Sequence, residues 1–95
     1  MGRVMVTAVG VTGADQVVST TGAVYAGYAL TATGGQAATV KIWDNPATGA
    51  GVLLDVVQLA SGETASTFYP GGIRAATGIY VDVTAGAVEG SVRIA

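Results

Sequence analysis

The stretch GIYVDVTAGAVEGSVRI (residues 78–94) alternates apolar and polar residues twice, with a glycine between the two runs. Alternation with a period of two is typical of a β-strand that buries one face. Two such runs around a short glycine-containing turn predict a β-hairpin with its turn at Ala85 and Gly86. The apolar faces are expected to consist of Ile79, Val81 and Val83 in the first strand and Val88, Gly90, Val92 and Ile94 in the second.

This hairpin predicts a pair of like charges. If Val83 faces Val88, then Asp82 lies directly across from Glu89, and like charges in that position destabilise a sheet. Compensation is expected from a cation, from a partner's Arg or Lys, or from solvation. Calcium takes oxygen ligands, but two carboxylates do not complete such a site. We therefore expect Asp82 and Glu89 on a solvated outer face or at a partner contact, with no metal site.

The rest of the chain shows the same period of two, no helical stripe and no internal repeat. Glycine and polar turns recur about every ten residues, which favours an all-β antiparallel sandwich or barrel of eight or nine short strands. A length of 95 residues indicates one domain. The other strands are expected at residues 3–9, 15–20, 23–33, 38–44, 52–60 and 64–69, with a brief strand or bend at 73–76.

Three finer expectations follow from these runs. In 23–33, Tyr25 is expected on the face opposite Tyr28 and Leu30. Because 52–60 is nearly all apolar, both of its faces are expected to be covered. Pro70, which cannot donate to a strand ladder, is expected to end the strand before it.

Residues 1–22 differ in composition from residues 23–95, the expected sandwich core. They are rich in Val and Thr and contain few large side chains. Two interpretations stay open for this segment, with a turn at 10–14 in either case. It is a strand pair of the core, or it is an arm that reaches a neighbouring subunit.

Charged residues make up only 11% of the chain, against about 25% on average, while 51% of residues are hydrophobic. So few charges do not cover the exterior of a small domain, which favours burial of part of the surface against other chains. The four cations are scattered and the net charge is −2, which disfavours nucleic-acid binding. No apolar run approaches the roughly 20 residues of a membrane helix, so no membrane contact is expected.

Catalysis is not expected. The chain has no His and no Cys, so the commonest general base, metal ligands and thiolate are missing. Its six acidic residues stand in no recognisable motif. We therefore predict that the protein is not an enzyme and holds no cofactor.

Two aromatic sites remain as candidate interfaces. Trp43 ends a strand and opens a loop, where it either anchors a partner or a sugar, or covers one end of the sandwich. In the second case, Asp44 and Asn45 cap the turn through side-chain hydrogen bonds. Tyr69 precedes Pro70 and two glycines, so it either joins such a platform or marks a strand end. The candidate interface residues are thus Trp43, Tyr69, Asp82 and Glu89.

Several segments between residues 22 and 95 together resemble small virion proteins of tailed bacteriophages. The segments are Lys41-Ile42-Trp43-Asp44 with the loop after it, Leu53-Leu54-Asp55, Pro70-Gly71-Gly72-Ile73, Gly78-Ile79-Tyr80-Val81-Asp82-Val83 and Glu89-Gly90-Ser91-Val92. The resemblance implies a β-sandwich, often a jelly roll, and carries over no functional residue set.

Within that group, decoration or cement proteins sit as homotrimers on threefold positions of the capsid and brace neighbouring capsomers. The resemblance therefore implies a structural protein made in the host cytoplasm and located on the virion, with copies of itself and the major capsid protein as partners. A fibre, tail or connector component, or a glycan-binding module built on Trp43 and Tyr69, is the alternative.

Overall fold

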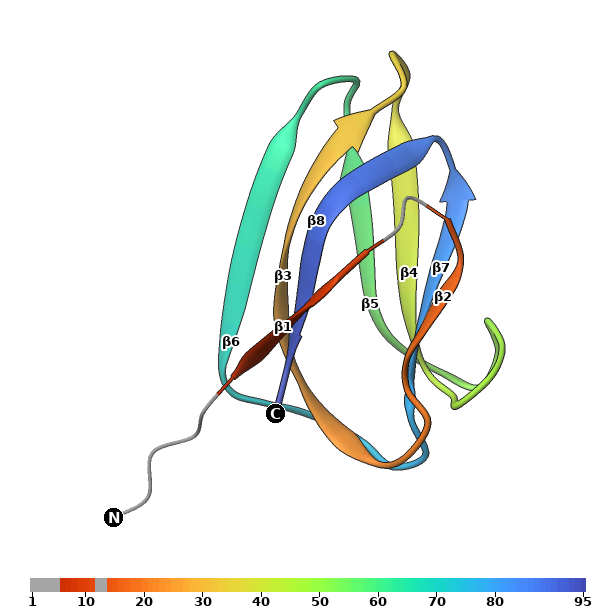
Figure 1. The fold of residues 1–95 in the computed structure, drawn as a ribbon, viewed down its shortest axis with the longest axis vertical. Helices are drawn as coiled ribbons and strands as arrows, with labels where there is room; N and C mark the ends of the chain where they lie inside the picture. The colour runs from red at the N-terminus through yellow and green to blue at the C-terminus, as the bar shows by residue number, and fades with distance from the viewer. Residues whose placement is uncertain (1–5, 12–13) are drawn as a thin grey trace.

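The computed structural model describes residues 6–11 and 14–95, which form eight β-strands and no helix. One sheet has the strand order β1-β8-β3-β6 and the other the order β2-β7-β4-β5. The two antiparallel sheets pack against each other as a sandwich (Figure 1). The strands are β1 (Thr7–Gly10), β2 (Gln16–Ser19), β3 (Ala23–Thr33), β4 (Ala38–Asp44), β5 (Val52–Leu59), β6 (Thr64–Ala75), β7 (Ile79–Ala85) and β8 (Ala87–Ile94).

The predicted strand positions are therefore confirmed within the described residues. The bounds of β3 and β4 match the prediction at both ends, and most other strands differ by a few residues. The exception is β6, which joins the expected strand 64–69 and the brief strand or bend at 73–76 into one strand. Residues 3–5 of the first predicted strand and residues 12–13 of the turn at 10–14 lie outside the described residues. The described parts of residues 1–22 contribute one strand to each sheet, since β1 pairs with β8 and β2 pairs with β7.

The strand pairs are nested. The first strand pairs with the last, the second with the seventh, the third with the sixth and the fourth with the fifth, all antiparallel. Of the seven connections between these strands, only that from β4 to β5 stays within one sheet. The other six carry the chain from one sheet to the other.

The predicted hairpin at residues 78–94 is therefore wrong as a pairing, although both of its strands exist. β7 and β8 lie in different sheets, and Gly86 alone connects them. Gly86 has a φ of +70°, and a Cβ there would lie 2.3 Å from the carbonyl oxygen of Ala37. Alternation reports which face of a strand is buried, but it does not report which strand is the partner.

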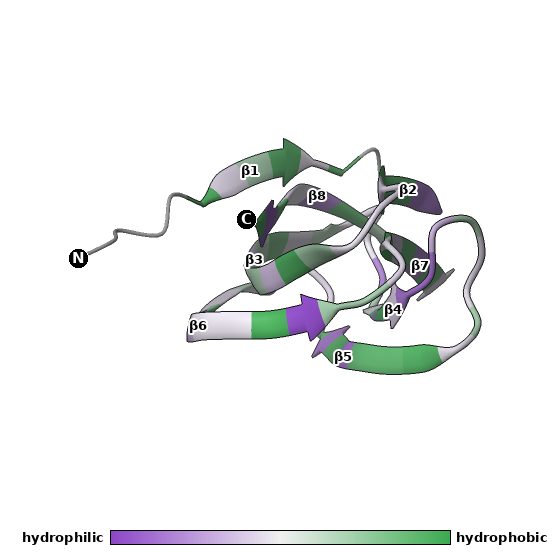
Figure 2. Cartoon of the chain, turned by 90° about the horizontal axis from the view of Figure 1, so that it is seen from below, coloured by the Kyte–Doolittle hydropathy of each residue, from purple (hydrophilic) through white to green (hydrophobic). Residues whose placement is uncertain are grey.

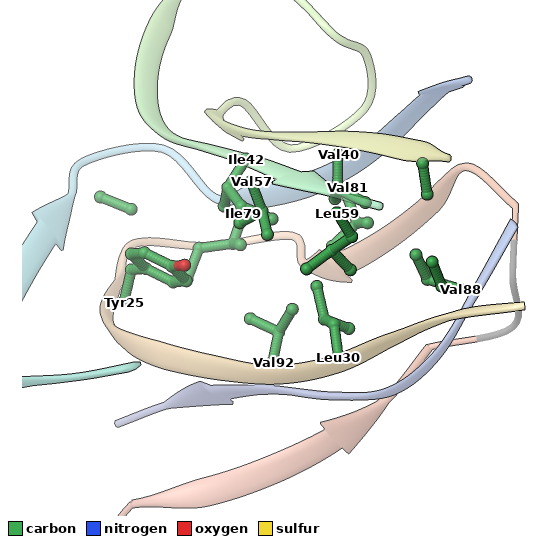
Figure 3. Packing of buried hydrophobic residues seen from close by; sticks show 13 residues of the cluster. Tyr25, Leu30, Val40, Ile42, Val57, Leu59, Ile79, Val81, Val88 and Val92 are labelled. Carbon is green, nitrogen blue, oxygen red and sulfur yellow. The ribbon is translucent and has the colours of Figure 1, made fainter. Parts of the chain in front are cut away.

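The core lies between the sheets and consists mainly of small aliphatic side chains (Figure 3). One sheet contributes Tyr25, Leu30, Ala32, Ala75, Val88 and Val92, and the other contributes Ala38, Val40, Ile42, Val57, Leu59, Ile79 and Val81. Every one of these side chains is at most 3% exposed. Their burial is the main favourable contribution to folding in a chain without disulfides.

A bulge in β3 overturns the expected faces of that strand. The pairing with both neighbours shifts between Tyr25 and Gly27, so that Ala26 is an extra residue. Tyr25 therefore shares the inner face with Leu30 and is fully buried, rather than facing the other way. Gly27 has a φ of +136°, and a Cβ there would lie 2.0 Å from the carbonyl oxygen of Thr67.

The same shift explains why β6 does not end at Pro70. Phe68 pairs with Gly27 and Ile73 pairs with Tyr25, so residues 69–72 bulge opposite the single residue Ala26. Pro70 lies within this bulge on an edge strand, where it removes no ladder hydrogen bond that the sheet needs. The strand then resumes through Ala75.

Substituting Gly27 by Ala is expected to lower the free energy of unfolding by about 3 kcal/mol, because an unfavourable φ and a backbone clash add. Gly62→Ala, at a positive φ with open space around it, is expected to cost about 1 kcal/mol. Gly10→Ala, with neither feature, should change stability by less than about 0.5 kcal/mol. Urea unfolding of the three variants measures this order, and equal losses at positions 27 and 62 would contradict it.

Candidate functional site

Trp43 lies on the outer face of the sheet that contains β4. The inward residues of β4 are buried, and Trp43 lies on the opposite face and is partly exposed. It pairs with Tyr80 on one side and with Leu53 on the other, and Tyr80 in turn pairs with Val17. These four side chains form an apolar and aromatic row that crosses the whole sheet.

The indole edge of Trp43 is engaged by the molecule itself. Its Nε1 donates a hydrogen bond to Oδ2 of Asp82 at 3.3 Å. The loop 45–51 covers this pair closely, since a Cβ on Gly49 would lie 2.6 Å from Oδ2 of Asp82 and 3.2 Å from the indole nitrogen. Trp43 and Asp82, both candidates from the sequence, thus belong to one site.

Asp82 and Glu89 are not neighbours, which corrects the expected acid pair. Asp82 pairs with Lys41 on β4, so its cross-strand neighbour carries the opposite charge. Glu89 pairs with Thr31 in the other sheet and is exposed there. The conflict that the hairpin register implied does not arise, because each acid lies in its own sheet.

The loop after Trp43 is fixed by two side-chain caps. Oδ1 of Asn45 accepts hydrogen bonds from the backbone nitrogens of Ala47 and Thr48 at 2.8 and 2.9 Å, which confirms the expected capping role. Asp44 caps a different segment. Its carboxylate accepts the backbone N–H of Ala76 and both the N–H and the hydroxyl of Thr77, each at 2.9 Å. It thereby joins β4 to the bend between β6 and β7.

These donors lower the pKa of Asp44 below its ordinary value of 3.8, with the backbone N–H of Thr77 as the largest cause. A carboxyl group whose folded pKa is depressed stabilises the protein above its unfolded pKa. That contribution is lost as the pH falls through the lower, folded pKa.

Between pH 4 and pH 2, the melting temperature of the wild type should therefore fall more steeply than that of Asp44→Asn, whose side chain has no such proton equilibrium. Thr77→Val, which keeps both backbone donors, is expected to retain most of the wild-type slope. Thermal unfolding monitored by circular dichroism across this range compares the three proteins. If the melting temperatures of the wild type and Asp44→Asn fall equally with pH, the Asp44 cap does not contribute to the pH dependence of stability.

Tyr69 lies at a second site, away from Trp43. Its hydroxyl donates to Oδ2 of Asp55 at 2.8 Å, and the hydroxyl of buried Tyr25 donates to the same oxygen at 2.8 Å. The two rings tilt against each other with their centroids 5.8 Å apart. Since Asp55 is on β5 and both tyrosines are on the opposite sheet, this clamp of Tyr25, Asp55 and Tyr69 links the two sheets.

Burial and the nearby carboxylate both hold the phenols in their protonated, donating form. Desolvation is the first cause that raises the pKa of Tyr69 to about 12, and the hydrogen bond to Asp55 is the second. The same two causes, in the same order, raise the pKa of Tyr25 further. A carboxylate inside an apolar sheet costs free energy unless such donors satisfy it.

Sequence reasoning did not find this clamp. An acid within the apolar run Leu53-Leu54-Asp55-Val56-Val57 was a usable signal, because such a residue needs a buried donor. The partners were hidden by the bulge at Ala26, which turns Tyr25 inward. Consequently Trp43 and Tyr69 do not share one surface, as a common platform requires.

Removing one phenol hydroxyl should destabilise the fold by about 1–3 kcal/mol, because the carboxylate loses a charge-assisted hydrogen bond. Tyr25→Phe is expected to cost more than Tyr69→Phe, since Tyr25 is fully buried and water cannot replace its hydroxyl. Tyr80→Phe, on the outer face, is the control and should change stability by less than about 0.5 kcal/mol. Chemical denaturation measures all three, and a loss in Tyr80→Phe as large as in Tyr25→Phe contradicts the clamp.

β5 carries exposed apolar side chains, which overturns the expectation that both of its faces are covered. Val52 is 64% exposed, Leu53 42% and Val56 44%. β5 is an edge strand, and its outer face points away from the other sheet. Figure 2 shows it as a largely hydrophobic strand at the border of the molecule, beside the edge strand β6.

Within residues 6–11 and 14–95, no pocket is present and no three acidic side chains gather in a way that suits a metal ion. That part of the chain also contains no helix long and apolar enough to cross a membrane. Comparisons with protein-family models, with curated proteins and with solved structures each find no match.

Proposed function

We propose that this protein is a structural protein of a tailed-phage virion, acting as a capsid decoration protein that braces neighbouring subunits of the head shell. It binds there as a homotrimer and contacts the major capsid protein. In this role the protein supplies rigid, weakly charged surface, and no catalytic group is required of it.

One observation carries this proposal. The side of the sandwich formed by β5 and β6 exposes large apolar side chains, in a chain with only 11% charged residues. The largest contiguous apolar patch on a protein surface often has a function, and large patches mark sites of protein association. Edge strands that lack protection are templates for contact with another chain.

The strand order adds support from the fold. Nested pairs in two four-stranded sheets correspond to a rolled-up double Greek key, and we interpret the sandwich as a jelly roll. Jelly rolls occur in viral capsid proteins, and also in lectins and other proteins. The fold alone therefore favours a virion role by analogy, and the exposed side of the sandwich favours assembly over ligand binding.

Binding to shells tests the proposal. Empty shells are assembled from the major capsid protein encoded nearest to this chain's gene, mixed with the purified protein and separated by sedimentation. We expect the protein to co-sediment in hundreds of copies per shell and to raise the temperature at which the shells rupture. The oligomeric mass of the purified protein in the absence of shells is measured in parallel by light scattering.

The stoichiometry separates the alternatives. Six or twelve copies per virion indicate a connector or tail component and contradict decoration. A protein that stays monomeric at high concentration and does not bind the shells contradicts a structural role in the virion altogether.

A further inference from the structure

Exposed apolar side chains gather on the two edge strands at one side of the sandwich. Seven large apolar side chains are substantially exposed in the described residues, and five of them belong to β5 and β6. These five are Val52, Leu53, Val56, Phe68 and Ile73. We call this set the β5–β6 side.

Leu53 and Val56 on β5 and Phe68 on β6 point to opposite outer faces of the sandwich, whereas Val52 and Ile73 are exposed at its edge. Val56 follows the alternation of β5, in which Val57 and Leu59 fill the core, so Val56 points away from the core. Phe68 lies between two inward residues of β6, one of which is Tyr69 in the clamp, so it points outward from the other sheet. It pairs with Gly27, which has no side chain, and Phe68 is 57% exposed.

We propose that copies of this chain pack through the β5–β6 side around a threefold axis, so that Leu53 and Val56 of one copy contact Phe68 of the next. In such a ring, the β5–β6 side of all three copies lies at the axis. The outer face of the sheet that contains β5 in one copy then contacts the outer face of the sheet that contains β6 in the next copy. Such a contact is heterologous and closes into a ring. The number three rests on the proposed function, whereas the choice of surface rests on the exposed side chains.

The threefold arrangement covers side chains that a twofold contact of β5 with β5 leaves exposed. A twofold contact of β5 with β5 buries Leu53 and Val56 against their own copies and leaves Phe68 in water. A closed ring of three covers the apolar side chains on both outer faces. The distribution of apolar side chains over both edge strands therefore favours the ring.

The two edge strands of this contact carry few charges, and Lys41, which lies across from Val56 on β4, has Asp82 as its other cross-strand neighbour. Among the residues of β5 and β6, the charged side chains are Asp55 and Arg74. Asp55 is turned inward and accepts both tyrosine hydroxyls of the clamp. No lysine on β5 protects its open edge, which is a common way in which soluble proteins prevent edge contacts.

The area is of the size that a stable contact needs. The exposed fractions of the five side chains correspond to roughly 400 Å² of apolar surface, taking about 160 Å² for a fully exposed one. Since apolar atoms make up about 57% of a typical interface, this implies roughly 700 Å² buried on each copy. Standard-sized interfaces bury about 800 Å² per partner.

Two lysine substitutions and one matched control test the surface. Val56→Lys and Phe68→Lys place a charge in the proposed contact, whereas Val17→Lys places the same charge on an equally exposed edge strand of the β5 sheet, at 41% against 44% exposure. Light scattering over a concentration series measures the mass of each protein. Circular dichroism and thermal unfolding establish that each variant is folded.

We expect the wild type and Val17→Lys to be trimers. Val56→Lys and Phe68→Lys should need at least about 30-fold higher concentration for half-assembly, as for the loss of one central contact. A monomeric wild type overturns the proposal, and so does a Val17→Lys variant that dissociates while Val56→Lys remains a trimer.

Cysteine crosslinking tests the geometry without destabilising charges, because the chain has no native cysteine. With a short bismaleimide, the double variant Val56→Cys/Phe68→Cys should give covalent trimers, and Val56→Cys alone should give no covalent product. Covalent dimers from Val56→Cys alone indicate a twofold contact and contradict the ring.

The outcome for this surface is separable from the outcome for the proposed function. A trimer that forms through the β5–β6 side but does not bind shells contradicts decoration and leaves the contact established. Shells that bind a protein with no self-association support decoration and exclude the ring.

Discussion

The structure depends on one layer of small apolar side chains that the two sheets share. Six of the seven connections in the described chain pass from one sheet to the other, so consecutive strands meet across the core rather than through a ladder. Backbone hydrogen bonds then form between strands far apart in the sequence, such as β1 with β8. Valine, alanine and isoleucine fill this layer because their short, stiff side chains pack closely between two pleated surfaces.

That constraint explains where glycine is indispensable. Gly86 carries the chain between the sheets in one residue, with backbone atoms of Ala37 and Ala38 within 3 Å of the place of its Cβ. Gly90 pairs with Leu30 at a φ of +129°, where a Cβ would lie 2.0 Å from the carbonyl oxygen of Ala29. Gly86 thus connects the two sheets without a larger loop, and Gly90 lets β8 lie close to the backbone of β3 in the same sheet.

The sequence predicted the strands of this fold well and their partners poorly. Period-two alternation located β3 and β4 to the residue, because alternation is a local property. The pairing of β7 with β4, and not with β8, is set by the core that β3 to β8 build together. The sites show the same contrast between local and distant interactions. The caps of Asn45 were predictable from neighbouring residues. The hydrogen bond from Tyr25 to Asp55 spans 30 positions and requires the bulge at Ala26.

The apolar outer face of β5 is not a consequence of how the core is built. Val57 and Leu59 already supply the inward apolar residues of this strand, and Asp55 joins it to the opposite sheet. The core therefore does not require Leu53 and Val56 to be apolar, and polar residues at these two positions preserve the alternation of the strand. On the same sheet, Lys41 occupies the outward position beside Val56, and Asp82 the outward position beside Lys41. The apolar identity of the outer face of β5 is thus a property of the surface, which needs an explanation outside the single chain.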